Sequence, residues 1–158
     1  MRELQLPLAG VCRCGQIAIR VTRLPLLTSA CHCAGCQKMS SSAYSLTSTF
    51  PVEGFEVLEG EPVIGGLHGT DVHHYFCGHC MSWMFTRPAG MDWFVNVRPT
   101  MFADTGWFRP FIETYTSQML PFAQTGAMKS YERFPEMTEY EGLMKEYDAW
   151  SRSRFTPR

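Results

Sequence analysis

The feature that most constrains this chain is a run of three cysteines within six residues: Cys31, Cys33 and Cys36. The remaining four cysteines form a C-x-C pair upstream and a C-x-x-C pair downstream: Cys12, Cys14, Cys77 and Cys80. Structural zinc nearly always has four protein ligands, whereas catalytic zinc usually has three and keeps one position open. Because the seven cysteines divide as four plus three, we predict a zinc site closed by the two outer pairs and a second, open zinc site on the central run.

Two other interpretations of the cysteines stay open. They could be reduced, buried thiols or partners in disulfides, although disulfides suit small secreted domains and an odd number of cysteines fits them poorly. The central three could also act as redox thiols in a reductase. Thiol titration with and without a chelator separates the redox interpretation from the zinc hypothesis.

The bulk composition is that of an ordinary globular protein of 158 residues, with 45% apolar and 18% charged residues. The formal net charge is −1 and the sequence has no Lys/Arg run, which disfavours a nucleic-acid partner. No apolar run approaches the roughly 20 residues that span a bilayer, and the first residues do not form a signal peptide. We therefore expect a cytoplasmic protein with no membrane partner.

Alternating apolar residues and regular turn signals indicate a mainly β fold, an all-β sandwich of about seven short strands. The strands are predicted over residues 16–22, 42–50, 55–59, 72–76, 82–86, 92–98 and 112–117. The small polar residues after the central cysteines predict a tight turn or the start of a short helix. We expect the core to contain a group of aromatic side chains: Trp83, Phe85, Trp93, Phe94, Trp107 and Phe108.

The C-terminal segment has a different pattern. From Met137 the apolar residues recur every three or four positions, which predicts an amphipathic helix, with Thr138 as N-cap and Glu141 completing a capping box. We divide the chain into a zinc-binding β domain over residues 1–136 and a helical tail over 137–158 that packs on the same domain. Docking of the tail on a partner subunit, as in a homodimer, is the alternative.

Three fragments of the sequence, GVCRCGQIAI, CHCAGCQK and FCGHC, resemble the glutathione-dependent formaldehyde-activating enzyme (GFA) or centromere-protein-V family. The resemblance covers roughly residues 8 to 116. The resemblance implies a complex β-sandwich of the Mss4-like kind. It also implies a structural zinc on Cys12, Cys14, Cys77 and Cys80, and a catalytic zinc on Cys31, Cys33 and Cys36. The founding activity of this family joins glutathione to formaldehyde, giving S-hydroxymethylglutathione, and is classed as that of a carbon–sulfur lyase.

The sequence departs from the family pattern at three places. Met81 stands where a glycine usually follows the C-x-x-C pair, and we expect this change to be tolerated. Ser40-Ser41-Ser42 replaces a run that often contains glycine, and Val97-Arg98-Pro99-Thr100 replaces a Gly-Thr-Leu-Asp-Asp-like stretch. The last two changes leave the zinc ligands intact, but they could reshape the pocket, so the true substrate and the use of glutathione stay open.

The chemistry of the open site suggests a mechanism. Zinc with three thiolates carries a net charge of −1, and it suits an incoming thiol because coordination removes the thiol proton. We therefore predict a zinc-dependent lyase that acts on thiol–aldehyde adducts, with a substrate thiol or water as fourth ligand. Its candidate catalytic residues are Cys31, Cys33, Cys36, His32 and Lys38.

Two of these candidates have alternative roles. His32 either points into the pocket as an acid or base, or points outward to solvent. Lys38 either pairs with a substrate carboxylate, compensates the negative charge of the zinc site, or is a solvated surface lysine. For the whole chain, the alternative to an enzyme is a non-catalytic zinc-stabilised binding module.

Overall fold

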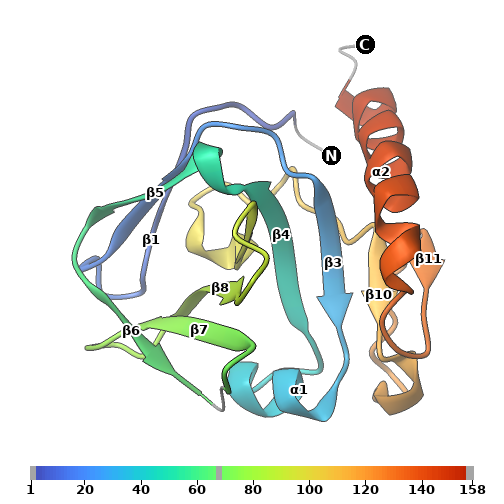
Figure 1. Cartoon of the computed structure of the whole chain (residues 1–158), viewed down its shortest axis with the longest axis horizontal. Helices are drawn as coiled ribbons and strands as arrows, with labels where there is room; N and C mark the ends of the chain where they lie inside the picture. Colours follow the sequence, from blue (N-terminus) through green and yellow to red (C-terminus); the bar gives the residue numbers. More distant parts are fainter. Residues whose placement is uncertain (1–2, 67–68, 156–158) are drawn as a thin grey trace. The chain divides into compact units, whose positions relative to one another are not determined.

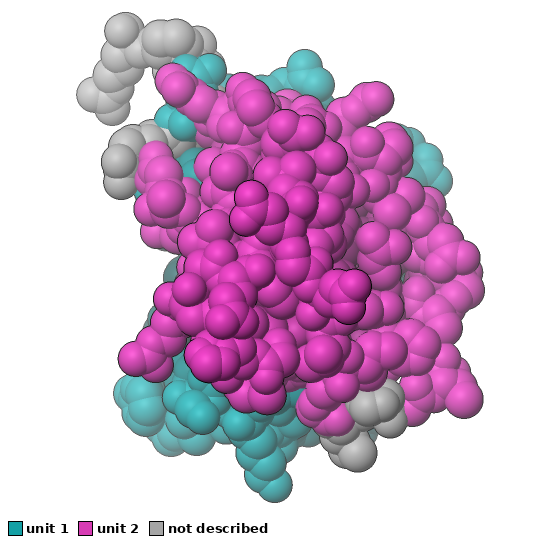
Figure 2. All heavy atoms as spheres, turned by 90° about the vertical axis from the view of Figure 1, so that its left-hand side faces the viewer, with its two compact units in different colours: residues 1–3, 26–48, 106–158 teal, residues 4–25, 49–105 magenta. Residues whose placement is uncertain are grey.

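The computed structural model describes residues 3–66 and 69–155. Over these residues the fold is mainly β, with eleven strands in two sheets, one of three and one of eight strands, and a C-terminal helix (Figure 1). This confirms the predicted fold class. The chain divides into two compact units (Figure 2). The first unit comprises residues 1–3, 26–48 and 106–158, and the second comprises residues 4–25 and 49–105.

In the first unit, three parallel strands lie side by side, with β10 (Ile112–Thr114) between β3 (Leu27–Cys31) and β11 (Lys129–Ser130). Helix α1 (Ala34–Ser40) follows β3, and β4 (Ser45–Pro51) then leads into the second unit. A 3-10 turn (Thr116–Gln118) follows β10. Because Thr114 pairs with Cys31, the end of β10 lies beside the start of the cysteine run.

Helix α2 (Tyr140–Phe155), preceded by a 3-10 turn over Met137–Glu139, packs on this part of the sheet. Its apolar face and the strands form one buried cluster: Leu27, Phe111, Ile112, Leu143 and Tyr147. The predicted cap was wrong, because the capping box consists of Glu136 and Glu139 rather than Thr138 and Glu141. No described helix is long and apolar enough to cross a membrane.

The second unit is antiparallel. Strand β2 (Ala18–Val21) pairs with β1 (Leu8–Val11) and β5 (Phe55–Glu59). A ladder continues from β6 (Pro62–Gly65) through β7 (Val72–Cys77) and β8 (Trp83–Pro88) to β9 (Phe94–Val97). Two 3-10 turns complete the unit, over Val52–Gly54 and Pro99–Met101. The β1–β2 and β7–β8 turns each carry one of the outer cysteine pairs.

Each predicted strand corresponds to an observed one, and 55–59 agrees with β5 at both ends while the others are shifted. Four observed strands were not predicted: β1, β3, β6 and β11. Strands β1 (LAGV) and β6 (PVIG) contain glycine or proline, which weakens their strand pattern. Strand β10 stops three residues earlier than predicted because Tyr115 is left-handed, with φ 57°. Trp93 was wrongly assigned to the core, since it precedes β9 and is 52% exposed, whereas Trp83, Phe85 and Trp107 are buried.

The predicted boundary at residue 137 lies inside the first unit, and the division into domains stays a prediction. The packing of α2 is nevertheless testable. We expect Leu143→Ala to lower the free energy of unfolding by about 3 kcal/mol, because it removes a buried side chain from the cluster under α2. Met137→Ala, at a 70% exposed position, is the control and should leave the melting temperature unchanged. Equal melting temperatures for both variants would contradict this packing.

Candidate metal sites

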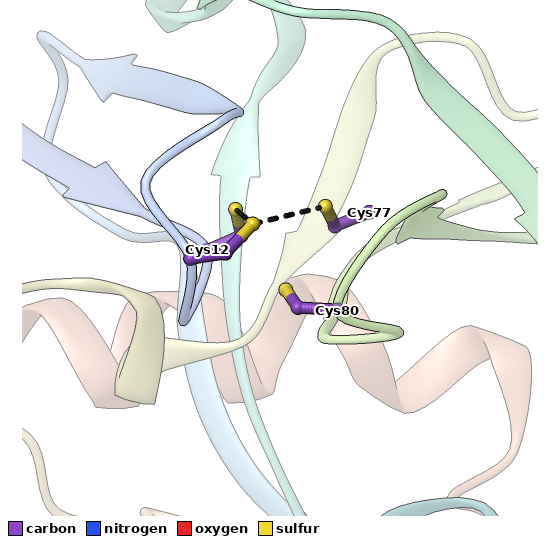
Figure 3. A group of neighbouring side chains, drawn as sticks. Cys12, Cys77 and Cys80 are labelled. Atoms are coloured by element: carbon purple, nitrogen blue, oxygen red, sulfur yellow. Dashed lines mark hydrogen bonds between the residues drawn. The ribbon is translucent and has the colours of Figure 1, made fainter.

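The two outer cysteine pairs meet in the second unit. Figure 3 shows the sulfur atoms of Cys12, Cys77 and Cys80 turned toward one another from two loops. All four sulfurs lie within 4.8 Å of one another, and Cys14 Sγ is 3.5 Å from Cys12 Sγ and 3.7 Å from Cys77 Sγ. Zn–S bonds of about 2.3 Å in a tetrahedron place sulfurs about 3.8 Å apart. This cluster could therefore hold a metal ion with four thiolate ligands.

The first of these loops is shaped by hydrogen bonds to Cys12. Its N–H donates to the Ile17 carbonyl at 3.0 Å, while its carbonyl accepts from the Gly15 N–H at 3.0 Å. The Ile17 N–H donates to Cys12 Sγ at 3.3 Å. Gly15 has φ 79°, and a Cβ there would meet no atom within 4 Å. Its glycine is therefore explained by the left-handed backbone and not by lack of space.

The second loop repeats this arrangement around Cys77, whose N–H donates to the Ser82 carbonyl and whose carbonyl accepts from the Met81 N–H, both at 3.0 Å. Met81, like Gly15, directly follows the second cysteine of its pair and is left-handed, with φ 55°. Ser82 Oγ lies 3.2 Å from Cys80 Sγ and accepts from the Arg13 N–H, which joins the two loops. Met81 thus takes a left-handed conformation at the position where a glycine was expected, which implies backbone strain, and its tolerance stays a prediction.

The central three cysteines converge in the first unit, where their sulfurs lie within 4.8 Å of one another. Cys31 ends β3, and Cys33 is the N-cap of α1. The extended backbone at Cys33 turns alternate side chains to opposite sides, so Cys31 and Cys33 share one side. Cys36 lies one helical turn further, and its N–H donates to Cys33 Sγ at 3.3 Å. A strand end followed by a helix start thus gathers the three sulfurs, which could hold a metal ion.

Two glutamines fix this loop. Gln37 Nε2 donates to the carbonyls of His32 at 2.6 Å and Gln118 at 2.9 Å. Gln118 Oε1 accepts from the Ala34 N–H at 2.7 Å. The backbone around the central cysteines is therefore held in place by the protein itself.

The three central thiols differ in acidity. An interaction with the Cys36 side chain, opposed by burial, lowers the pKa of Cys31 to about 5. Burial raises the pKa of Cys33, and the interaction with Cys31 followed by burial raises that of Cys36. Negative charge without a metal thus gathers on Cys31. A divalent cation would favour ionisation of all three, so metal binding should release protons.

His32 is fully buried, so the predicted outward orientation is wrong. Its Nε2 lies 3.3 Å from Glu113 Oε2, and its ring packs edge-on against Tyr44. Glu113 also accepts from Ser130 and Thr125, and although burial opposes ionisation, these hydrogen bonds lower the pKa of Glu113. Glu113 was not predicted as part of the site, and its signal in the sequence is weak: one acidic residue in the short strand IET. Lys38 is exposed in the last turn of α1.

Comparisons with known proteins agree with this geometry. The family model described as "Glutathione-dependent formaldehyde-activating enzyme" (GFA) matches residues 7–118, more than half of the chain. A crystal structure of a Rhodobacter sphaeroides protein from a structural genomics programme is similar in fold, with 18% sequence identity and a TM-score of 0.52. That similarity covers 61% of this chain and 89% of the other. No curated protein sequence gives a significant match.

The strain at Met81 leads to a prediction. Met81→Gly should raise the free energy of unfolding by about 0.5–1 kcal/mol. Relief of the left-handed strain at a non-glycine residue stabilises the fold by roughly 1–2 kcal/mol. Part of this is offset because glycine makes the unfolded chain more flexible. Met81→Ala removes the same exposed side chain but keeps the strain, so it should be no more stable than the wild type. Denaturant unfolding of the three proteins would measure this, and an equal gain from alanine and glycine would contradict it.

Proposed function

Since this chain belongs to the GFA family, we propose that it is a zinc-dependent enzyme of the carbon–sulfur lyase type that acts on thiol–aldehyde adducts. The family description supports a thiol-related small-molecule substrate. We take S-hydroxymethylglutathione, the adduct that the resemblance implies, as the reference compound. In such a reaction a carbon–sulfur bond forms between a thiol and an aldehyde carbonyl, or breaks in the reverse direction. We propose a cytoplasmic location, where thiolates stay reduced.

The observation that carries this proposal is the convergence of three sulfurs without a fourth ligand. Within residues 3–66 and 69–155, no further cysteine, histidine, aspartate or glutamate joins the set of Cys31, Cys33 and Cys36. The outer cluster, in contrast, has four sulfurs. A closed set suits a structural metal and an incomplete set leaves a position for a substrate. The sulfur-only donors favour zinc among the common divalent cations.

The residues of the central site have separate parts in the proposal. Cys31, Cys33 and Cys36 would hold the zinc, which supplies a position where an incoming thiol loses its proton. Gln37 and Gln118 keep the loop in one conformation, so the substrate meets fixed sulfurs. Lys38 offers a positive charge for a substrate carboxylate. His32 is buried and bonded to Glu113, which supports a role in holding the loop.

Zinc stoichiometry tests the proposal. Native mass spectrometry of protein purified without chelator should find two zinc ions per chain in the wild type and one in Cys36→Ser, because this change removes a ligand from the central set only. Cys36→Ser should stay folded and lose lyase activity. Cys77→Ser should lower the thermal stability, since it opens the four-cysteine set.

One zinc per wild-type chain, with the central thiols reactive in the absence of chelator, would overturn the lyase mechanism and favour redox chemistry. Two zinc ions without lyase activity on any thiol–aldehyde adduct would favour the binding module.

The role of glutathione can be tested through Lys38. If Lys38 contacts a substrate carboxylate, Lys38→Gln should raise KM for S-hydroxymethylglutathione about two- to fivefold, the range of an exposed ion pair. KM for the adduct of formaldehyde with uncharged 2-mercaptoethanol should not change. Lys145→Gln, which removes an exposed lysine paired with Glu141 on α2, is the matched control. Equal KM changes for both adducts would contradict carboxylate recognition by Lys38.

A further inference from the structure

Glu113 gathers hydrogen bonds from three segments of the first unit. Ser130 Oγ donates to Glu113 Oε1 at 2.6 Å, and Thr125 Oγ1 donates to Oε2 at 2.6 Å. His32 Nε2 lies 3.3 Å from Oε2 and supplies the third donor. Both carboxylate oxygens are thus occupied, and only 8% of the residue is exposed. A buried carboxylate bonded in this way fixes the segments that donate to it.

His32 lies between two of the three central cysteines in the sequence, but its side chain takes the opposite direction. In the register of β3 and β10, Glu113 lies opposite Ala30 and Thr114 lies opposite Cys31. Because side chains alternate along a strand, the imidazole that reaches Glu113 lies on the other side from the Cys31 sulfur. Among the described residues, the His32 ring makes one hydrogen bond, from Nε2 to Glu113, while its buried Nδ1 has no hydrogen-bond partner. The orientation of the ring therefore depends on Glu113 and on the edge contact with Tyr44.

We propose that Glu113 is a positioning residue of the central cysteine site. Its carboxylate fixes His32, and through His32 the direction in which Cys31 and Cys33 present their sulfurs. Thr125 and Ser130 hold the carboxylate, so the segment beyond residue 118, where the family match ends, forms part of the support of the site. This inference rests on the proposed function, because it requires a metal at the central cysteines.

The expected effect follows from preorganisation. With His32 held, the C-x-C backbone presents two sulfurs at a fixed spacing before the metal arrives. Without this anchor, only the hydrogen bonds of Gln37 and Gln118 hold the loop, so metal binding must order the C-x-C segment further and the affinity of the central site falls. Residues that orient metal ligands from behind typically change metal affinity by 10–100-fold when mutated. Since Glu113 acts through His32, which is not a ligand, we expect the lower end of this range.

Cobalt titration of the full chain tests the inference, because Co²⁺ bound to thiolates has visible d–d bands that report ligand geometry. In Glu113→Gln, we expect Co²⁺ affinity at the central site to fall about tenfold and its d–d bands to shift, while the four-cysteine site stays unchanged. Cys36→Ser identifies the signal of the central site. Ser117→Ala is the matched control, since it removes a hydroxyl donor to the Glu132 carbonyl in the same unit. It should bind Co²⁺ as the wild type does.

Ser130→Ala provides a milder variant if Glu113→Gln does not fold. It removes one donor to the carboxylate, and we expect a smaller loss of affinity, about threefold, with the same change in the bands. Wild-type affinity and bands in both variants, or equal losses at both metal sites, would overturn the role of Glu113. A wild-type chain that binds a single Co²⁺ would instead overturn the proposed function itself.

Discussion

The structure depends on the crowding of sulfur atoms at two places. Each cluster brings its cysteine sulfurs within 4.8 Å of one another, and thiolates at this spacing repel each other. Within the central cluster the conflict is visible in the acidities, since a low pKa at Cys31 accompanies raised values at Cys33 and Cys36. A soft divalent cation attracts each thiolate and so offsets the repulsion between them, which is the physical reason to expect metal at both clusters.

The two clusters are built from different local structures. The outer one lies on two β-hairpin turns, each with a left-handed residue directly after its second cysteine, Gly15 or Met81. Such turns repeat the same backbone hydrogen bonds and supply two sulfurs each, so the set closes at four. The central one lies at the junction of β3 and α1, where one segment supplies three sulfurs. Among residues 3–66 and 69–155, no fourth cysteine, histidine, aspartate or glutamate joins these three sulfurs, so the set found there has three members.

Features set by residues close together in the sequence could be predicted, whereas features set by residues far apart in the sequence could not. The cysteine spacings are local, and they predicted both clusters with the correct members. Alternation predicted seven of the strands, but it missed β1, β3 and β6 and the short parallel strand β11, whose pairing depends on β10. The bond between His32 and Glu113 joins residues 81 positions apart and has no local pattern. Trp93 shows how much strand ends matter, since β9 starts two residues later than predicted and Trp93, which precedes it, is exposed.

The family assignment and the details of the site therefore carry different information. The match over residues 7–118 includes every cysteine, so both cysteine clusters lie within the region that this chain shares with its family. The hydroxyls that hold Glu113, from Thr125 and Ser130, lie beyond the match, as does all of α2. Tyr140, at the start of α2, has a pKa raised to about 12. Burial is the main cause, followed by the charges of Tyr131 and then Cys31, so Tyr140 lies within electrostatic reach of the central cysteines. The surroundings of the central cysteines therefore include residues from outside the shared region, and these can vary among relatives while the cysteines stay the same.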